Sequence, residues 1–100
     1  MTYFYLFLAG ALLCNAIPHL VSGVLGQRFF TPWARPRGTG RSSAVQNALW
    51  GGANLAAGLA LVAHVWGEQT PHGAKLLLAG FLVAAVGTAA LFGRRVDKGL

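Results

Sequence analysis

Three long stretches of the sequence contain no charged side chain, namely residues 1–27, 42–67 and 76–93. An α-helix rises about 1.5 Å per residue, so roughly 20 apolar residues cross the hydrocarbon core of a bilayer. The pattern therefore predicts an all-α integral membrane protein, a single membrane domain over residues 1–100. Its three transmembrane helices are expected at about residues 3–25, 44–66 and 75–93, with a basic loop at 27–43. The first stretch lacks the basic residues that begin a secretory signal, so we expect it to be retained.

Local signals agree with these boundaries. Ser43 and Gln46 form an S-x-x-Q capping box, in which each side chain bonds a free backbone N–H at the start of a helix. Gly67 can adopt the left-handed conformation that commonly closes a helix. Thr70 followed by Pro71 is typical of an N-cap with proline in the first helical position. These signals predict that the second helix starts after residue 43 and the third near residue 71.

Composition strengthens the membrane assignment, because 55% of residues are hydrophobic and only 10% are charged. A typical soluble domain has about 25% charged residues. The formal net charge is +6, from eight Lys or Arg and two acids. Seven of the eight basic residues lie in the first loop or after the third span, and Lys75 alone lies elsewhere. The positive-inside rule then predicts that the N-terminus is outside and the C-terminus is cytoplasmic. Because topology explains the charge, we expect no nucleic-acid partner.

The basic loop mixes arginines, aromatic rings, prolines and glycines with neither a helical nor a strand period. We expect a non-regular interfacial segment, because arginine with interleaved aromatic rings suits anionic lipid headgroups. Whether the loop enters the bilayer is left open by the sequence. The predicted headgroup residues are Arg28, Trp33, Arg35, Arg37 and Arg41.

A polar intramembrane cluster is the sharpest chemical feature of the sequence. Helical rise places Asn15 and Asn54 within about 3 Å of the bilayer midplane, so they can meet. His19 lies about 8 to 9 Å toward the cytoplasm, a depth that Asn47 and Gly51 bracket on the antiparallel second helix. Two interpretations stay open for Asn15, His19, Asn47 and Asn54. They are hydrogen-bonding glue between helices, or they face a ligand or an ion path.

Small residues mark faces on which helices can pack closely in lipid. Gly51 and Gly58 share the face of Asn47 and Asn54 on the second helix. Gly80 and Gly87 share a face of the third helix. We therefore predict that these four glycines are helix-packing positions.

The sequence offers little that catalysis needs. No acid lies within a span, which counts against proton-coupled export, and a catalytic Ser/His/Asp or Cys/His set is hard to assemble. Cys14 is the single cysteine. His64 and His72 are close in depth, but two histidines without a third ligand are a weak signal for metal or haem. We expect no enzyme, no metal and no cofactor.

Several short motifs carry a resemblance. They are Asn-Ala-Ile-Pro-His at 15–19, Phe-Thr-Pro at 30–32, Gly-Thr-Gly-Arg-Ser-Ser at 38–43, and Asn-Ala-Leu-Trp-Gly at 47–51 with Asn54. Over about the first sixty residues the chain resembles a family of small bacterial integral membrane proteins of uncharacterised function. The resemblance implies a multi-span fold in the bacterial inner membrane, and it brings neither an activity nor a ligand.

Three hypotheses for function follow. The leading one is a non-enzymatic small membrane protein, surrounded by membrane lipids, that associates with itself or with a larger membrane complex through its small-residue helix faces. The alternative is a homo-oligomeric channel or carrier with a polar path lined by the intramembrane cluster. The third is binding of haem or metal by His64 and His72.

Overall fold

The computed structural model describes residues 1–99, and within them the chain forms three α-helices and one short β-hairpin. The elements are α1 (Thr2–Val24), β1 (Phe29–Phe30), β2 (Arg41–Ser42), α2 (Ala44–His64) and α3 (Gly73–Asp97). The predicted mainly helical fold with three long helices is confirmed. Among the helices of the described residues, α1 and α3 are long and apolar enough to cross a membrane, by length and composition. α2 does not reach the same mean hydropathy, although the sequence predicts a span there.

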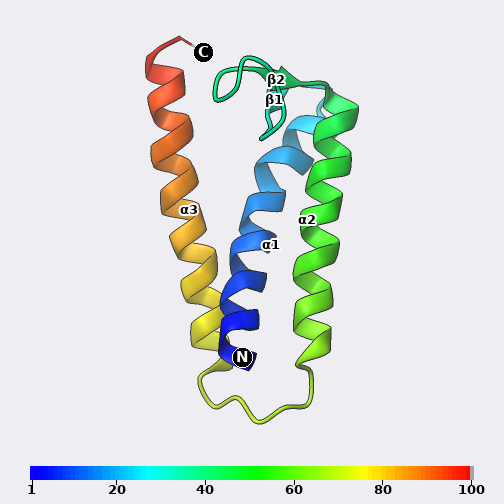
Figure 1. Cartoon of the computed structure of the whole chain (residues 1–100), viewed down its shortest axis with the longest axis vertical. Helices are drawn as coiled ribbons and strands as arrows, with labels where there is room; N and C mark the ends of the chain where they lie inside the picture. Colours follow the sequence, from blue (N-terminus) through cyan, green and yellow to red (C-terminus); the bar gives the residue numbers. More distant parts are fainter. Residues whose placement is uncertain (100) are drawn as a thin grey trace.

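α1 is the central helix of the molecule. It lies between α2 and α3 and packs along both, whereas α2 and α3 make almost no contact with each other within residues 1–99 (Figure 1). The helices run up, down and up, so α1 is antiparallel to α2 and parallel to α3 (Figure 1). The bundle measures 46 × 25 × 20 Å. The hairpin and the C-terminal end of α3 lie at one end, and the start of α1 lies at the other (Figure 1).

The predicted capping box is present at the start of α2. The Gln46 backbone N–H donates to Ser43 Oγ at 3.2 Å, and the Ser43 N–H donates to Gln46 Oε1 at 3.3 Å. α2 ends at His64, two residues before its expected end, and Gly67 adopts the left-handed conformation with φ of 88°. The predicted start of α3 is wrong, because the helix begins at Gly73, with His72 as its N-cap. The Gly73 N–H instead closes a turn on the carbonyl of Thr70, at 2.8 Å.

The basic loop is more ordered than the sequence indicates. Its two ends pair as antiparallel strands, with Phe29 opposite Ser42 and Phe30 opposite Arg41. The hydroxyls of Thr31 and Ser42 form a hydrogen bond, and both residues are buried. The interpretation as a wholly non-regular segment is therefore wrong at its ends, because this pairing satisfies backbone groups that the absence of sequence periodicity left unassigned.

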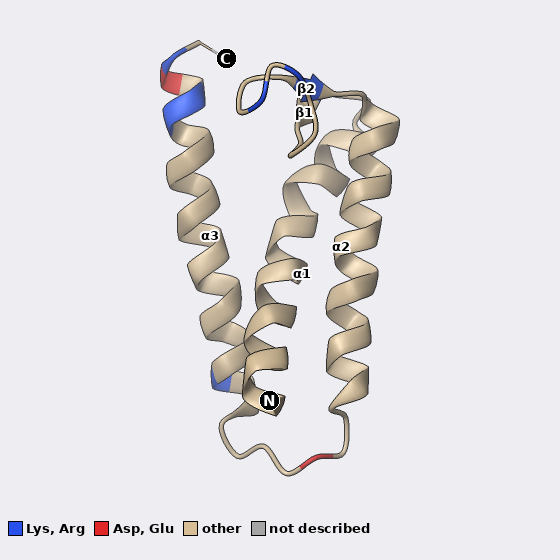
Figure 2. Ribbon diagram, in the orientation of Figure 1, with Lys and Arg blue, Asp and Glu red and all other residues tan. Residues whose placement is uncertain are grey.

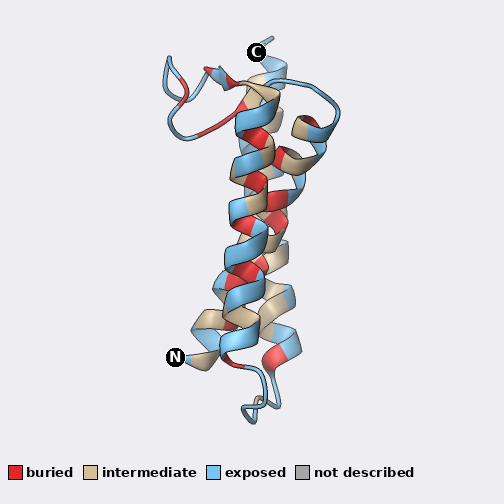
Figure 3. Cartoon of the chain, turned by 90° about the vertical axis from the view of Figure 1, so that its right-hand side faces the viewer, coloured by how far each residue is buried: buried red, intermediate tan, exposed pale blue. Residues whose placement is uncertain are grey.

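Charge differs between the two ends of the bundle, whereas burial differs between its inner and outer sides. Lys and Arg gather at the end that holds the hairpin and the C-terminus, and a single basic residue marks the opposite end (Figure 2). Buried positions run along the inner side of the bundle, and the outer helix surfaces are exposed (Figure 3). The end with most of the cations is thus the end at which the hairpin covers the helices.

Candidate functional site

The four residues of the predicted polar cluster form two hydrogen-bonded pairs between α1 and α2. Asn15 Nδ2 donates to Asn54 Oδ1 at 3.1 Å, and His19 Nδ1 lies 2.8 Å from Asn47 Oδ1. Asn54 also donates to the carbonyl of Trp50, one turn back in α2. The bonds of Asn15 with Asn54 and of His19 with Asn47 join two helices, as polar side chains do between helices in a membrane. The pairs therefore tie α1 to α2 at two levels.

Asn47 is the centre of the pair nearer the hairpin and is completely buried. Its Nδ2 lies within hydrogen-bond distance of three backbone carbonyls, those of Phe29 and Ser42 at 3.2 Å and that of Ser43 at 3.0 Å, and its two N–H groups are shared among them. This side chain joins the first turn of α2 to both strands of the hairpin and, through His19, to α1. Helical spacing placed Asn47 near His19 but gave no indication that it also holds the hairpin.

The network of Asn47 fixes the tautomer of His19. Turning the Asn47 amide over would place Oδ1 against three carbonyl oxygens, so Oδ1 must face His19 and accept a hydrogen bond. His19 Nδ1 therefore carries the proton. In the neutral ring, Nε2 is then a free acceptor. His19 is only 3% exposed, and no described residue forms a hydrogen bond with Nε2.

A cavity of about 290 Å³ lies beside His19, beneath the hairpin. Asn15 and His19 of α1, Trp50 of α2, and Thr88, Phe92 and Arg95 of α3 contribute to its wall, together with the loop after β1. The indole Nε1 of Trp50 is buried without a hydrogen-bond partner among the described residues. The cavity thus combines polar groups and aromatic rings from all three helices.

A cluster of aromatic rings lies on the hairpin side of the cavity, and Phe30 and Phe92 form part of the cavity wall. Phe92 packs edge-on against Phe29, with ring centres 4.8 Å apart, and stacks on Phe30 at 5.7 Å. The Arg95 guanidinium lies over the same rings, 4.8 Å from the centre of Phe30 and 5.2 Å from that of Phe92. Arg41 contacts Phe30 at 5.1 Å. Arginine stacked on rings in this way gains a cation–π attraction and keeps its N–H donors free at its edge.

Three of the four predicted packing glycines lie against α1. A Cβ on Gly51 would meet Leu20, a Cβ on Gly58 would meet Leu13, and a Cβ on Gly80 would overlap the carbonyl of Phe7. Gly87 is different, because a Cβ there meets nothing within 4 Å. Gly87 therefore does not pack on another helix within residues 1–99, and its packing against a partner stays a prediction. Figure 1 shows α3 farther from α1 toward the hairpin end, where Gly87 lies beyond the close contact at Gly80.

The predicted headgroup residues lie on the loop at the hairpin end. All five residues are exposed, namely Arg28, Trp33, Arg35, Arg37 and Arg41. The ring of Trp33 packs edge-on against that of Trp50 at 5.2 Å, so it anchors the loop to α2. Their contact with lipid headgroups stays a prediction.

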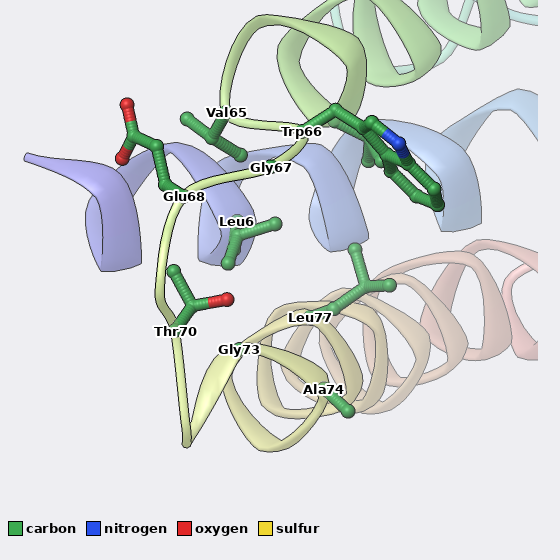
Figure 4. Close-up of a pocket in the computed structure, with 10 residues that line it drawn as sticks. Leu6, Val65, Trp66, Gly67, Glu68, Thr70, Gly73, Ala74 and Leu77 are labelled. Carbon is green, nitrogen blue, oxygen red and sulfur yellow. The ribbon is translucent and has the colours of Figure 1, made fainter.

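The opposite end holds a second cavity, of about 450 Å³, where the 65–72 connection meets α1 and α3 (Figure 4). Leu6, Val65 and Leu77 give it an apolar wall. Glu68 turns away from these side chains and accepts a hydrogen bond from the hydroxyl of Thr2 (Figure 4). Apart from the hydroxyl of Thr70, which points toward this space in Figure 4, the wall offers little specific chemistry, because a binding site usually combines several convergent polar groups.

The two histidines at this end do not gather a ligand set. His64 packs edge-on against Tyr5, with ring centres 5.6 Å apart, and both His64 and His72 are exposed. Within residues 1–99, no three His, Cys, Asp or Glu side chains lie close enough to hold a metal ion.

The structure adds two residues that the sequence patterns did not single out. The sequence marks Arg95 only as one of the basic residues after the third span, and Trp50 only as part of the motif at 47–51. One sequence pattern could have indicated Arg95. Thr88, Phe92 and Arg95 follow the i, i+4, i+7 spacing that places residues on a single helix face. No family model, curated protein or solved structure matches this chain.

Proposed function

We propose that all three helices cross a bilayer and that the protein works there without enzymatic chemistry, by associating with itself or with a larger membrane complex. The main support for a membrane location is the burial pattern of α2, which is the reverse of that in a soluble bundle. Its buried residues are Asn47, Gly51, Asn54 and Gly58, which are all polar or small. Its large apolar residues face outward, with Leu49 69% exposed and Leu59 55% exposed.

A helix of a soluble bundle buries its apolar stripe and exposes its polar face. α2 does the opposite, which suits a helix with lipid outside and close helix contacts inside. The same inversion accounts for its modest hydropathy, because the glycines and asparagines that lower the mean are the residues that contact α1. α2 has 21 residues. A helix of that length spans roughly 30 Å, which is enough to cross the hydrocarbon core beside α1.

The charge distribution supports an orientation with the hairpin and the C-terminus in the cytoplasm. Basic residues near span ends stay on the cytoplasmic side, and the hairpin end carries seven of the eight. The resemblance to small bacterial membrane proteins favours the inner membrane. Gln69→Cys and Lys98→Cys, each combined with Cys14→Ser, test this orientation in intact cells with a membrane-impermeant maleimide. We expect labelling at position 69 only, and labelling at position 98 alone would reverse the orientation.

The surface for association must differ from the one that the sequence suggested. Gly51, Gly58 and Gly80 already contact α1, so they are not free to meet a partner. Val83, Gly87 and Ala90 continue the face of Gly80 along α3 at helical spacing, and all three are exposed. A glycine within a helix costs about 0.5–1 kcal/mol relative to alanine, and close approach of another helix would offset that cost. We assign the association surface to this strip of α3.

Native mass spectrometry of protein gently extracted from its own membrane tests the proposal. The expected result is a defined complex, either a homo-oligomer or an assembly with a second protein, that Gly87→Leu breaks. Gly93→Leu is the matched control, because a Cβ at Gly93 also meets nothing within 4 Å. Gly93 lies about 120° around the helix from Gly87. A chain that is monomeric in the wild type, or a complex that survives Gly87→Leu, would overturn the assignment.

A further inference from the structure

The cavity beneath the hairpin presents an unusual pair of polar groups. His19 is almost completely buried, and its Nδ1–H is committed to Asn47, so the free Nε2 edge is an acceptor on the cavity wall. Trp50, on the same wall, adds a buried indole Nε1 without a hydrogen-bond partner among the described residues, and such atoms are rare in folded proteins. The group that would satisfy neutral Nε2 is a hydrogen-bond donor, such as a hydroxyl.

Arg95 supplies the second group, a cation with no Asp or Glu partner within residues 1–99. The chain has two acids, and Glu68 lies at the opposite end of the bundle with Thr2. Asp97 is exposed and stands two residues from Arg95 on α3, a spacing at which side chains do not face each other. With its face stacked on Phe30 and Phe92, the guanidinium keeps a fork of N–H donors that matches the oxygens of a phosphate.

An apolar hollow adjoins the polar cavity. It has a volume of about 450 Å³ and lies between α1 and α3, lined by Ile17, Phe81 and Ala85. Thr88 and Phe92 contribute to the walls of both spaces, so the two are neighbours. A polar cavity for a headgroup beside an apolar surface for a chain is the arrangement that an amphiphile needs. This feature favours a lipid over a free, water-soluble phosphate.

We propose that this site binds an anionic phospholipid whose headgroup also carries a hydroxyl group. Arg95 binds the phosphate oxygens, His19 Nε2 accepts a hydrogen bond from the headgroup hydroxyl, and an acyl chain lies along the apolar hollow. Sites for whole small molecules begin at roughly 300 Å³. The polar cavity is of that smallest size, which suits a headgroup alone. The location agrees with the proposed membrane orientation, since Arg95 lies in the last turn of α3 at the cation-rich end.

Short-chain lipids added to the detergent-solubilised protein test the site by isothermal titration calorimetry. The probes are dioctanoyl phosphatidylglycerol, dioctanoyl phosphatidylmethanol and dioctanoyl phosphatidylcholine, with glycerol phosphate as the free headgroup. Phosphatidylmethanol keeps the charge and lacks the hydroxyl, and phosphatidylcholine has no net negative charge. We expect phosphatidylglycerol to bind most tightly, phosphatidylmethanol more weakly, and the other two weakest. Equal binding of phosphatidylglycerol and phosphatidylcholine, or equally tight binding of glycerol phosphate, would overturn the proposal.

Two neighbouring arginines provide a matched pair of variants. Arg95→Gln removes the cation of the site, and Arg94→Gln removes a cation one residue away that does not line the cavity. A charged hydrogen bond contributes enough that we expect Arg95→Gln to weaken phosphatidylglycerol binding about tenfold. Arg94→Gln should change it less than about twofold, because a charge outside the site acts only through the screened surface potential. Equal effects of the two substitutions would refute a specific site.

A spectroscopic test leaves every residue of the site unchanged. In protein with ¹⁵N-labelled histidine and with His64→Gln and His72→Gln, the remaining signals report on His19. We expect the Nδ1–H tautomer without lipid, and a shift of the Nε2 signal on saturation with phosphatidylglycerol. An Nε2 signal that does not move would exclude the His19 contact. Because this readout and the calorimetry are independent of the Gly87 surface, they distinguish failure of lipid binding from failure of association.

Discussion

Asn47→Ala should destabilise the fold far more than Asn54→Ala, although the two asparagines occupy the same face of α2, seven residues apart. Asn47 is fully buried, and its amide bonds His19 and three backbone carbonyls. Alanine would leave the His19 Nδ1–H as a buried donor without a partner. A buried donor left without an acceptor lowers the free energy of unfolding by about 1–3 kcal/mol, and each further hydrogen bond lost lowers it by about 0.5–1.5 kcal/mol. The expected loss in free energy of unfolding is about 2–4 kcal/mol.

Asn54→Ala is the matched control, because it makes the same chemical change in the same helix. It removes a single interhelical bond, the one from Asn15. Such bonds average about 0.6 kcal/mol in membrane proteins. Asn15 is only half-buried and lines the cavity, so its amide can turn to another partner. The gain in helix propensity from Asn to Ala is similar at the two positions and cancels in the comparison.

Reversible unfolding with sodium dodecyl sulfate in mixed micelles, followed by far-ultraviolet circular dichroism, measures both losses. Asn47→Ala should cost at least about 1.5 kcal/mol more than Asn54→Ala. Equal losses would show that the hairpin and His19 do not depend on the Asn47 amide. In a folded Asn47→Ala chain, the His19 tautomer should also become mixed, because the acceptor that fixes it is gone.

Glycine and capping contacts give smaller effects that the same unfolding measurement detects. A Cβ at Gly80 would overlap the backbone carbonyl of Phe7, and a Cβ at Gly87 meets nothing. Gly80→Ala should therefore cost about 2 kcal/mol, whereas Gly87→Ala should be neutral or stabilise by up to about 1 kcal/mol. Equal effects would contradict the different contacts of these two glycines. Ser43→Ala removes the side-chain cap of α2. It should cost about 1 kcal/mol, and an unchanged stability would show that the capping box contributes nothing.

The parts of the fold that the sequence predicted depend on short-range rules. A capping box needs only residues three apart, and Ser43 and Gln46 form it as expected. The face shared by Asn47 and Asn54 follows from helical spacing alone. The rise per residue predicts that Asn54 and Asn15 lie at the same depth in the bilayer. In the structure a hydrogen bond joins the two side chains. Such inferences work because rise and periodicity are constant along a helix.

The path of α3 could not be predicted in this way. Gly80 and Gly87 share one face of an ideal helix, yet only Gly80 lies close to α1. Near its end, α3 instead meets the hairpin, where Phe92 packs against Phe29 and Phe30. The hairpin has no sequence period, and two paired residues at each end are enough to form it. The last turns of α3 therefore make tertiary contacts with a segment that periodicity does not describe.

The same geometry explains why a count of charges could not identify Arg95. Orientation rules treat Arg94, Arg95 and Lys98 as equal contributions to one side of a membrane. Successive helical residues are about 100° apart, so Arg94 points elsewhere while Arg95 lies over the rings of Phe30 and Phe92. These rings come from the hairpin and from α3, and they meet only because the hairpin folds back onto the bundle. The separation that leaves Gly87 open within the chain thus also creates the space in which His19 and Arg95 face the same cavity.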